Sequence, residues 1–398
     1  MLSLIPALAA VIEKVLDVKD SKEELKSLPI TADRFIVHYN SFSRTLLQKC
    51  KKKYENLILS PFSLLMLLAV AADATSGLTK KEIANALYNA DCYEETKKLL
   101  CELQKLILSD TFMSSNAVCI DQRFEKHVLP DFMKTLNTGF GGNVFASENI
   151  QEEVNKWATE KTKGLIKEIS ISMKPNEMLA ACLLNAVAFK ADWVNKVEET
   201  AIKQEEFENI DTTINKVSMM HSKEKSYIED DYYVGFVKPY QKDFSFMALL
   251  PKEKGPIFLE KAIGKLDMTT LFANKTPDKV MVTMPEFESQ CSSDLRAACK
   301  AMGIRTVFTN GADFSPMISD VLLKAGAIKQ KALIKVNREG TEAAAVTYMP
   351  GITTTGVRLE PKPKVIKLDR PFVYAIMHNE TAIPVFIGIL NSMSKVYY

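Results

Sequence analysis

Residues 338–346, Arg-Glu-Gly-Thr-Glu-Ala-Ala-Ala-Val, constrain the fold more than any other part of this 398-residue chain. Neighbouring residues of a strand face opposite sides of a sheet, and Gly340 adds a pivot whose φ is unrestricted. One alternating set is uncharged and mostly small: Thr341, Ala343, Ala345, Thr347 and Met349. Glu342, in the other set, can stay at the surface. Alone, these residues would also suit an Ala-rich surface helix or coil, but their pattern is what a segment needs to enter a packed sheet as an extra strand.

Composition indicates a soluble globular protein. Hydrophobic residues make up 47% and charged residues 25%, and 51 basic side chains nearly balance 49 acidic ones. A net charge of +2 argues against a nucleic-acid-binding protein. Length alone suggests two or three domains. However, no Gly/Ser/Pro-rich linker or repeat divides the chain, so we expect residues 31–398 to form a single domain.

The cysteines are odd in number, scattered, and without a CxxC pair, which fits neither a disulfide framework nor a zinc site. We expect most of them to be buried free thiols. This allows either a cytosolic origin or export without dependence on disulfides. The seven are Cys50, Cys92, Cys101, Cys119, Cys182, Cys291 and Cys299.

Residues 1–30 have two interpretations. Residues 1–12 are apolar like the core of a signal peptide, with Ala7, Ala9 and Ala10 placed for cleavage, but no positive side chain precedes them. The segment is too short to span a bilayer. Apolar residues also recur at the spacing of an amphipathic helix: Leu4, Ile5, Leu8, Val11, Ile12, Val15 and Leu16. Location therefore stays open between secreted or surface-associated and cytoplasmic.

Helical and strand patterns alternate irregularly, which is typical of an α+β fold. Residues 64–72 form an apolar run suited to a buried helix, with Ser60 placed to cap it and Pro61 in its first turn. Further helices are predicted over 152–168 and 295–302. Strands are predicted over 181–189, 244–250, 280–284, 332–336, 372–377 and 384–390.

Several segments resemble landmarks of the serpin family, in the family's order. Residues 56–63, Asn-Leu-Ile-Leu-Ser-Pro-Phe-Ser, resemble its Asn-x-x-x-Ser-Pro-x-Ser element. Residues 366–376, Ile-Lys-Leu-Asp-Arg-Pro-Phe-Val-Tyr-Ala-Ile, resemble its C-terminal motif, and residues 338–346 resemble its hinge. The likeness extends to 154–157, 185–190 with Trp193, 284–287, 312–315 and 384–388, so it covers the chain from about residue 31 to the end.

The resemblance implies an α+β serpin fold with three β-sheets, about nine helices and an exposed reactive-centre loop near residues 340–364. It implies a serine protease inhibitor, not an enzyme. In that family the cleaved loop stays acyl-linked to the protease and enters the main sheet, which distorts the protease. We expect a monomer that needs no cofactor or metal and has no transmembrane span.

The resemblance also assigns residues to roles. It places the hinge at Gly340, Thr341, Glu342, Ala343, Ala344 and Ala345, and the shutter and breach at Ser60, Ser63, Asn185, Gln330 and Trp193. Three positions depart from the family's pattern. Arg338 replaces a glutamate, Gln330 replaces a histidine but offers both a donor and an acceptor, and Pro350 interrupts the segment that would become a strand. These departures favour the alternative of a non-inhibitory serpin that serves as a binding, carrier or storage protein.

Two bonds of the reactive-centre loop are candidates for the one that the target protease cleaves, which we call the bait bond. The family's spacing from Gly340 points to the bond between Thr354 and Thr355. Chemistry points to the bond between Arg358 and Leu359, because Arg358 is the only basic residue between the hinge and Lys362. A guanidinium matches the carboxylate in the pocket of a trypsin-like protease. We therefore predict a trypsin-like target.

Other functional classes have less support. His38, His127, His221 and His378 stand far apart in the sequence, and no HExxH or GxSxG motif occurs, which argues against an enzyme. Glycosaminoglycan binding is not expected, because acidic residues are interleaved with the lysines of one early helix: Lys97, Lys98 and Lys105 with Glu94, Glu95 and Glu102. Asn274 and Asn379 match the glycosylation pattern.

Overall fold

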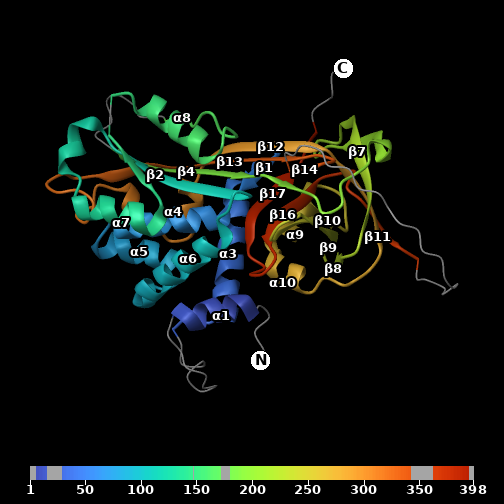
Figure 1. The fold of residues 1–398 in the computed structure, drawn as a ribbon, viewed down its shortest axis with the longest axis horizontal. Helices are drawn as coiled ribbons and strands as arrows, with labels where there is room; N and C mark the ends of the chain where they lie inside the picture. Colours follow the sequence, from blue (N-terminus) through green and yellow to red (C-terminus); the bar gives the residue numbers. More distant parts are fainter. Residues whose placement is uncertain (1–5, 16–28, 147, 172–179, 342–361, 394–398) are drawn as a thin grey trace.

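Three β-sheets and the helices around them make up the computed structural model, which describes residues 6–15, 29–146, 148–171, 180–341 and 362–393 (Figure 1). Among these residues, nine α-helices, α3 to α11, follow residue 31. The prediction of an α+β fold with three sheets and about nine helices is confirmed.

The main sheet has seven strands, in the order β3-β2-β4-β13-β14-β5, with β12 also paired to β13. Its central strands, β4 and β13, are parallel and directly paired, from Ala180 opposite Lys324 to Ala188 opposite Leu333. The strands are β2 (Phe112–Cys119), β3 (Asn143–Phe145), β4 (Ala180–Phe189), β5 (Ala191–Asp192), β12 (Phe287–Asp294), β13 (Lys324–Val336) and β14 (Gly340–Thr341).

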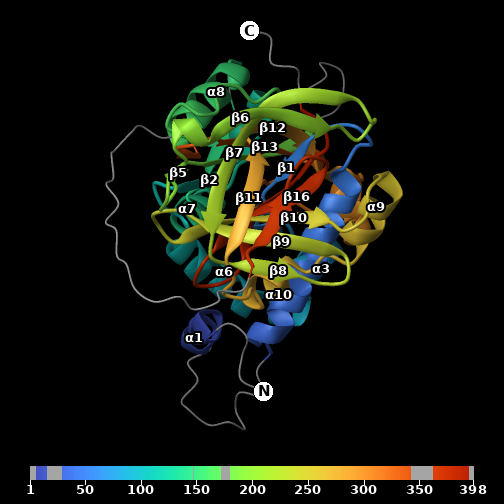
Figure 2. The same ribbon diagram turned by 90° about the vertical axis from the view of Figure 1, so that its right-hand side faces the viewer.

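Two smaller sheets lie toward one end of the main sheet (Figures 1 and 2). The six-stranded sheet has the order β1 (Leu57–Leu59), β17 (Pro384–Leu390), β16 (Phe372–His378), β10 (Phe244–Pro251), β9 (Tyr233–Pro239) and β8 (Tyr227–Glu229). The four-stranded sheet has the order β15 (Lys364–Lys367), β11 (Val280–Pro285), β7 (Ile214–Glu224) and β6 (Ile202–Glu208).

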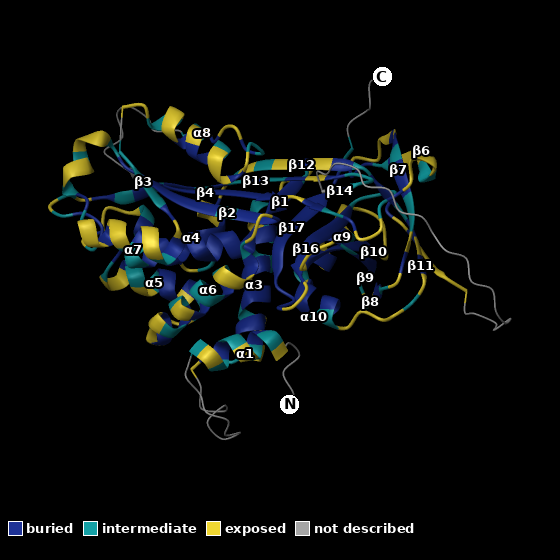
Figure 3. Ribbon diagram, in the orientation of Figure 1, coloured by how far each residue is buried: buried dark blue, intermediate teal, exposed yellow. Residues whose placement is uncertain are grey.

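The two faces of the main sheet are covered differently. Helix α4 (Pro61–Asp73) lies beneath it and is buried from Pro61 to Ala72, as its apolar run predicts (Figure 3). Its first turn is capped by Ser60, whose hydroxyl accepts from the Ser63 amide at 3.2 Å. Helix α8 (Ile150–Lys161) crosses the opposite face and buries Val154, Trp157 and Ala158, while its outer side is exposed.

Helix α8 is shorter than predicted. The sequence suggested a helix to residue 168, whereas α8 ends at Lys161. Lys163 and Gly164 adopt positive φ of 50° and 86°, which a right-handed helix cannot contain. The Thr162 hydroxyl stabilises the turn that follows by accepting from the Ile166 amide at 2.9 Å.

The remaining helices surround the sheets and include one in the amino-terminal extension. Helix α1 (Pro6–Val15) packs against α3 and α6, and it buries Leu8 and Ile12 as the helical spacing predicts. Within the described ranges, no helix is both long and apolar enough to cross a membrane. The others are α3 (Ala32–Cys50), α5 (Gly77–Leu87), α6 (Tyr93–Ile107), α7 (Pro130–Phe140), α9 (Pro256–Gly264), α10 (Met268–Ala273), α11 (Arg296–Ala301) and the short 3-10 helices η1 (Ala90–Cys92), η2 (Gln122–His127), η3 (Glu199–Ala201) and η4 (Thr306–Phe308).

Candidate functional site

The predicted hinge begins inside the main sheet. Strand β14 pairs antiparallel with β5, with Gly340 opposite Asp192 and Thr341 opposite Ala191. On its other side, Thr341 lies opposite Val336 of β13. The two residues of β14 therefore already lie between β13 and the strand that follows β4.

Only glycine fits the backbone at position 340. Its φ is +152°, and a Cβ there would overlap the carbonyl of Ala191 and the Cα of Asp192. Both are backbone atoms within a paired strand, so they cannot move aside. The glycine provides the close approach between β14 and β5.

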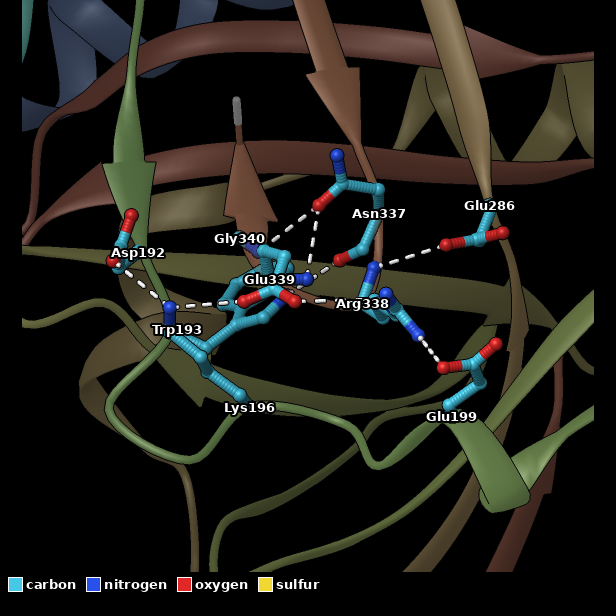
Figure 4. A network of polar contacts seen from close by, with 9 residues as sticks. All are labelled: Asp192, Trp193, Lys196, Glu199, Glu286, Asn337, Arg338, Glu339 and Gly340. Atoms are coloured by element: carbon cyan, nitrogen blue, oxygen red, sulfur yellow. Dashed lines mark hydrogen bonds and ion pairs between the residues drawn. The ribbon is translucent and has the colours of Figure 1, made fainter. Parts of the chain in front are cut away.

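A tight turn carries the chain from β13 into β14 (Figure 4). The side-chain oxygen of Asn337 accepts from the amides of Glu339 at 2.9 Å and Gly340 at 3.1 Å. The amide of Trp193 donates to the carbonyl of Glu339 at 3.0 Å, which attaches the turn to the segment after β5. The sequence did not reveal the role of Asn337, although Asn before a glycine-containing turn is a usable signal.

Charged side chains enclose this turn (Figure 4). Arg338 pairs with Glu199 at 3.0 Å, and its amide donates to a carboxylate oxygen of Glu286 at 3.0 Å. Glu339 pairs with Lys196 at 2.9 Å. The hydrogen bond with Glu199 raises the pKa of Arg338 further. Arg338 stands where the family usually has a glutamate, and its positive charge is balanced by nearby carboxylates.

Trp193 anchors the end of the sheet next to the turn. Its buried indole donates to the carbonyl of Asn337 at 2.8 Å and stacks on Tyr240 with ring centroids 4.2 Å apart. The Lys238 ammonium lies 5.2 Å from the centre of the indole ring and forms an ion pair with Glu224 at 2.7 Å.

The pair between Lys238 and Glu224 was not predicted from the sequence. Each side chain is only 2% exposed, so neither charge is solvated and each depends on its partner. The Lys238 ammonium also donates to the carbonyl of Asn195 at 3.0 Å. The only available signal was a charged residue within the otherwise apolar strand Tyr233–Pro239.

The four predicted shutter residues form one buried hydrogen-bond network. The Gln330 amide group donates to Asn185 at 3.0 Å and to the Ser60 carbonyl at 3.0 Å, and it accepts from the Ser60 amide at 2.7 Å. The Ser60 hydroxyl contacts the Ser63 hydroxyl at 2.9 Å. Gln330 thus supplies both a donor and an acceptor, in the place where the resemblance led us to expect a histidine.

Strand β2 completes this network with polar residues that the sequence analysis missed. The Ser63 hydroxyl donates to Ser114 at 2.8 Å, and the Asn185 amide donates to Asn116 at 3.0 Å. The detectable signal was Ser-Ser-Asn at 114–116, a polar run inside a strand that is otherwise apolar.

The predicted bait bonds lie outside the described residues. They are the bond between Thr354 and Thr355 and the bond between Arg358 and Leu359. Other predicted positions also lie outside the described residues: the hinge residues Glu342, Ala343, Ala344 and Ala345, and Pro350. The described chain stops at Thr341 and resumes at Lys362. Both bait bonds remain predictions.

Comparison with known proteins identifies the family. Residues 37–393 match the family model described as serpin (serine protease inhibitor). The chain belongs to the serpin family. This serpin is 30% identical over 357 residues to the leukocyte elastase inhibitor of Sus scrofa, covering 85% of this chain and 93% of that relative. It is 27% identical over 376 residues to Iris of Ixodes ricinus, covering 89% and 98%.

Solved serpin structures have the same fold. The thermophilic serpin tengpin in its native state matches with a TM-score of 0.80 and 28% identity, covering 91% of this serpin and 95% of tengpin. Thyroxine-binding globulin in complex with thyroxine matches with a TM-score of 0.76 and 24% identity, covering 90% and 99%. Serpins similar to this one thus include a protein named as an elastase inhibitor and a protein named for binding thyroxine.

Proposed function

We propose that this serpin inhibits a trypsin-like serine protease as a suicide substrate. The protease cleaves the bond between Arg358 and Leu359 and stays attached to Arg358 as an acyl-enzyme. The freed loop then enters the main sheet between β4 and β13, and the protease is carried away and distorted.

The observation that carries this proposal is the direct parallel pairing of β4 with β13 beside the antiparallel strand β14. A strand that continues from β14 runs antiparallel to β13 and therefore also to β4. Insertion replaces one parallel ladder with two antiparallel ladders, which pair slightly more stably per residue. Each inserted residue adds backbone hydrogen bonds, so insertion is favoured energetically.

The shutter network marks the contact that insertion has to break. The hydrogen bond of 3.0 Å between Gln330 and Asn185 joins β13 to β4 and closes the path of an incoming strand. Both side chains are buried, so each needs a new partner once the strands separate. Amide groups can rotate to donate to or accept from an inserted backbone.

Incubation with trypsin tests the proposal. We expect an SDS-stable complex of the two proteins, a released peptide that begins at Leu359, and a higher melting temperature after the loop is cut. A peptide that begins at Thr355 would support the spacing argument instead.

The alternative is a non-inhibitory serpin that binds, carries or stores another molecule. Pro350 in the loop favours it, because proline cannot donate to a sheet ladder. This alternative predicts simple cleavage by trypsin, with neither an SDS-stable complex nor a rise in melting temperature.

A further inference from the structure

The four-stranded sheet exposes an apolar pair at its edge. Val365 of β15 lies opposite Met281 of β11, and the two residues are 76% and 40% exposed. Lys223 of β7 lies opposite Met281 from the other side. Val365, Met281 and Lys223 therefore lie side by side on three adjacent strands, with the apolar residues nearest the sheet edge and the lysine farthest from it.

On and beside strands β7 and β15, four exposed lysines form no ion pair with a carboxylate of the described residues: Lys223, Lys225, Lys362 and Lys364. The Lys364 ammonium lies 4.9 Å from the centre of the Tyr227 ring. Three nearby carboxylates pair with other lysines. Glu224 pairs with Lys238 at 2.7 Å, Glu229 with Lys252 at 2.9 Å, and Glu205 with Lys367 at 2.8 Å. The pKa of Glu229 is lowered by its hydrogen bonds with Lys252 and Tyr227 and also by the charge of Lys364. We call Val365, Met281 and these four lysines the β15 surface.

The β15 surface directly follows the reactive-centre loop. Strand β15 begins at Lys364, six residues after Arg358. Six residues span at most about 20 Å when fully extended. A globular protease bound at Arg358 therefore has to lie over or beside β15, whereas a bond at Thr354 allows more distance. In Figure 1 this short red strand stands at the far right, beside β11.

We propose that the β15 surface is a secondary docking site for the target protease, and that the target carries an acidic, partly apolar patch beside its active-site cleft. The proposal rests on the proposed inhibitory function and adds a determinant of target choice. The lysines attract the acidic patch and speed up encounter, since complementary charge acts mainly on the association rate. Val365 and Met281 supply the apolar contact at the centre.

Two trypsins of opposite net charge provide the test, because they share the pocket for arginine and differ in surface charge. Reversing two lysines, Lys223→Glu with Lys364→Glu, should slow association with the anionic trypsin by about tenfold at low salt. The loss should shrink at high salt, where exposed charges are screened. The stoichiometry of inhibition should not change, and the cationic trypsin should not be slowed.

A matched control carries the same change in charge at the opposite end of the molecule. Lys98→Glu with Lys134→Glu alters exposed lysines of α6 and α7 and should leave both rates close to wild type. Lys362→Glu is a second test that does not endanger folding, because Lys362 precedes β15 and lies in no strand. It should slow the anionic trypsin in the same direction.

The outcomes separate this proposal from the function on which it rests. Covalent complexes that form at unchanged rates in the reversal variants, or rates that fall equally in the control, overturn the docking site alone. Loss of heparin binding without a change in association rate assigns the lysines to a polyanion and also overturns it. If the wild type forms no covalent complex with either trypsin, the inhibitory function fails and the docking site fails with it.

Discussion

Gln330 holds the backbone of Ser60 from both sides, since its carbonyl accepts from the Ser60 amide at 2.7 Å and its amide group donates to the Ser60 carbonyl at 3.0 Å. This joins the central strand β13 to the start of α4. Replacement by leucine removes both bonds and leaves the buried Ser60 groups without these partners. We expect Gln330→Leu to lower the free energy of unfolding by about 3 kcal/mol, measured by urea denaturation. Gln330→His, which keeps a donor and an acceptor, should lose clearly less; equal losses would contradict a hydrogen-bonding role.

The hinge residue Thr341 tests loop insertion. Thr341 already pairs within the main sheet, and the proposed insertion continues β14 from it and encloses its side chain. Thr341→Arg would then leave an unpaired charge in the sheet at a cost of several kcal/mol. We expect the variant to be cleaved by trypsin as a substrate with little SDS-stable complex, measured by gel electrophoresis. Glu342→Arg changes a residue of the alternate, outward-facing set and should still trap the protease. Undiminished trapping by Thr341→Arg would rule out insertion of this residue.

Arg358→Ala tests the bait bond. The pocket carboxylate of a trypsin-like protease loses its charge-assisted partner, which is typically worth about 2 to 3 kcal/mol. We expect trapping of trypsin to be abolished, measured as the rate of complex formation, while an elastase that cuts after Thr354 should be unaffected. Trapping of trypsin at the wild-type rate would shift the assignment to Thr354 and Thr355.

His378 should make the stability of this serpin depend on pH. Burial lowers the pKa of His378 from 6.5 to about 4. Between these two values the unfolded chain binds a proton that the folded chain does not, so the folded state loses stability as the pH falls through this window. The loss is at most about 3 kcal/mol. Denaturation at pH 7 and pH 4.5 should show a smaller loss in His378→Asn than in wild type, and an equal loss would contradict this source.

The amino-terminal helix should stabilise the body. Leu8 and Ile12 of α1 are 0% and 2% exposed, and burial of such a side chain contributes about 1.5 to 3 kcal/mol. Deletion of residues 1–29 should therefore lower the melting temperature or the solubility. Lys14→Ala, which removes only the exposed pair with Glu102, should change the melting temperature little. A deletion variant with unchanged melting temperature and solubility would show that α1 contributes nothing to the fold.

Strands that are continuous apolar runs with clear boundaries were predictable from the sequence. The run of residues 384–390 corresponds to β17 (Pro384–Leu390), because a proline begins it and polar Asn391 follows. Strand β13 (Lys324–Val336) was recognised only from residue 332 onward. Its first half alternates lysine, glutamine and small residues, so hydrophobic periodicity gives a weak signal there.

The site was predictable where a family motif covers it and hidden where it depends on distant contacts. The motif predicted Ser60, Ser63, Asn185 and Gln330, which the fold joins into one network. The ion pair of Lys238 with Glu224 connects two strands through side chains that no local pattern relates. Contacts of this kind follow only from the complete fold.

The direct contact between β4 and β13 also governs how this chain reaches its folded state. Gln330 and Asn185 are 145 positions apart in the sequence, so the centre of the main sheet cannot close until two distant segments of the chain have met. Closure over such a distance is slow. During that delay both strands expose unpaired edges that a second molecule can occupy. The direct contact of β4 with β13, on which we base loop insertion, therefore also makes folding compete with association between chains. The yield of folded protein should fall as the chain concentration rises.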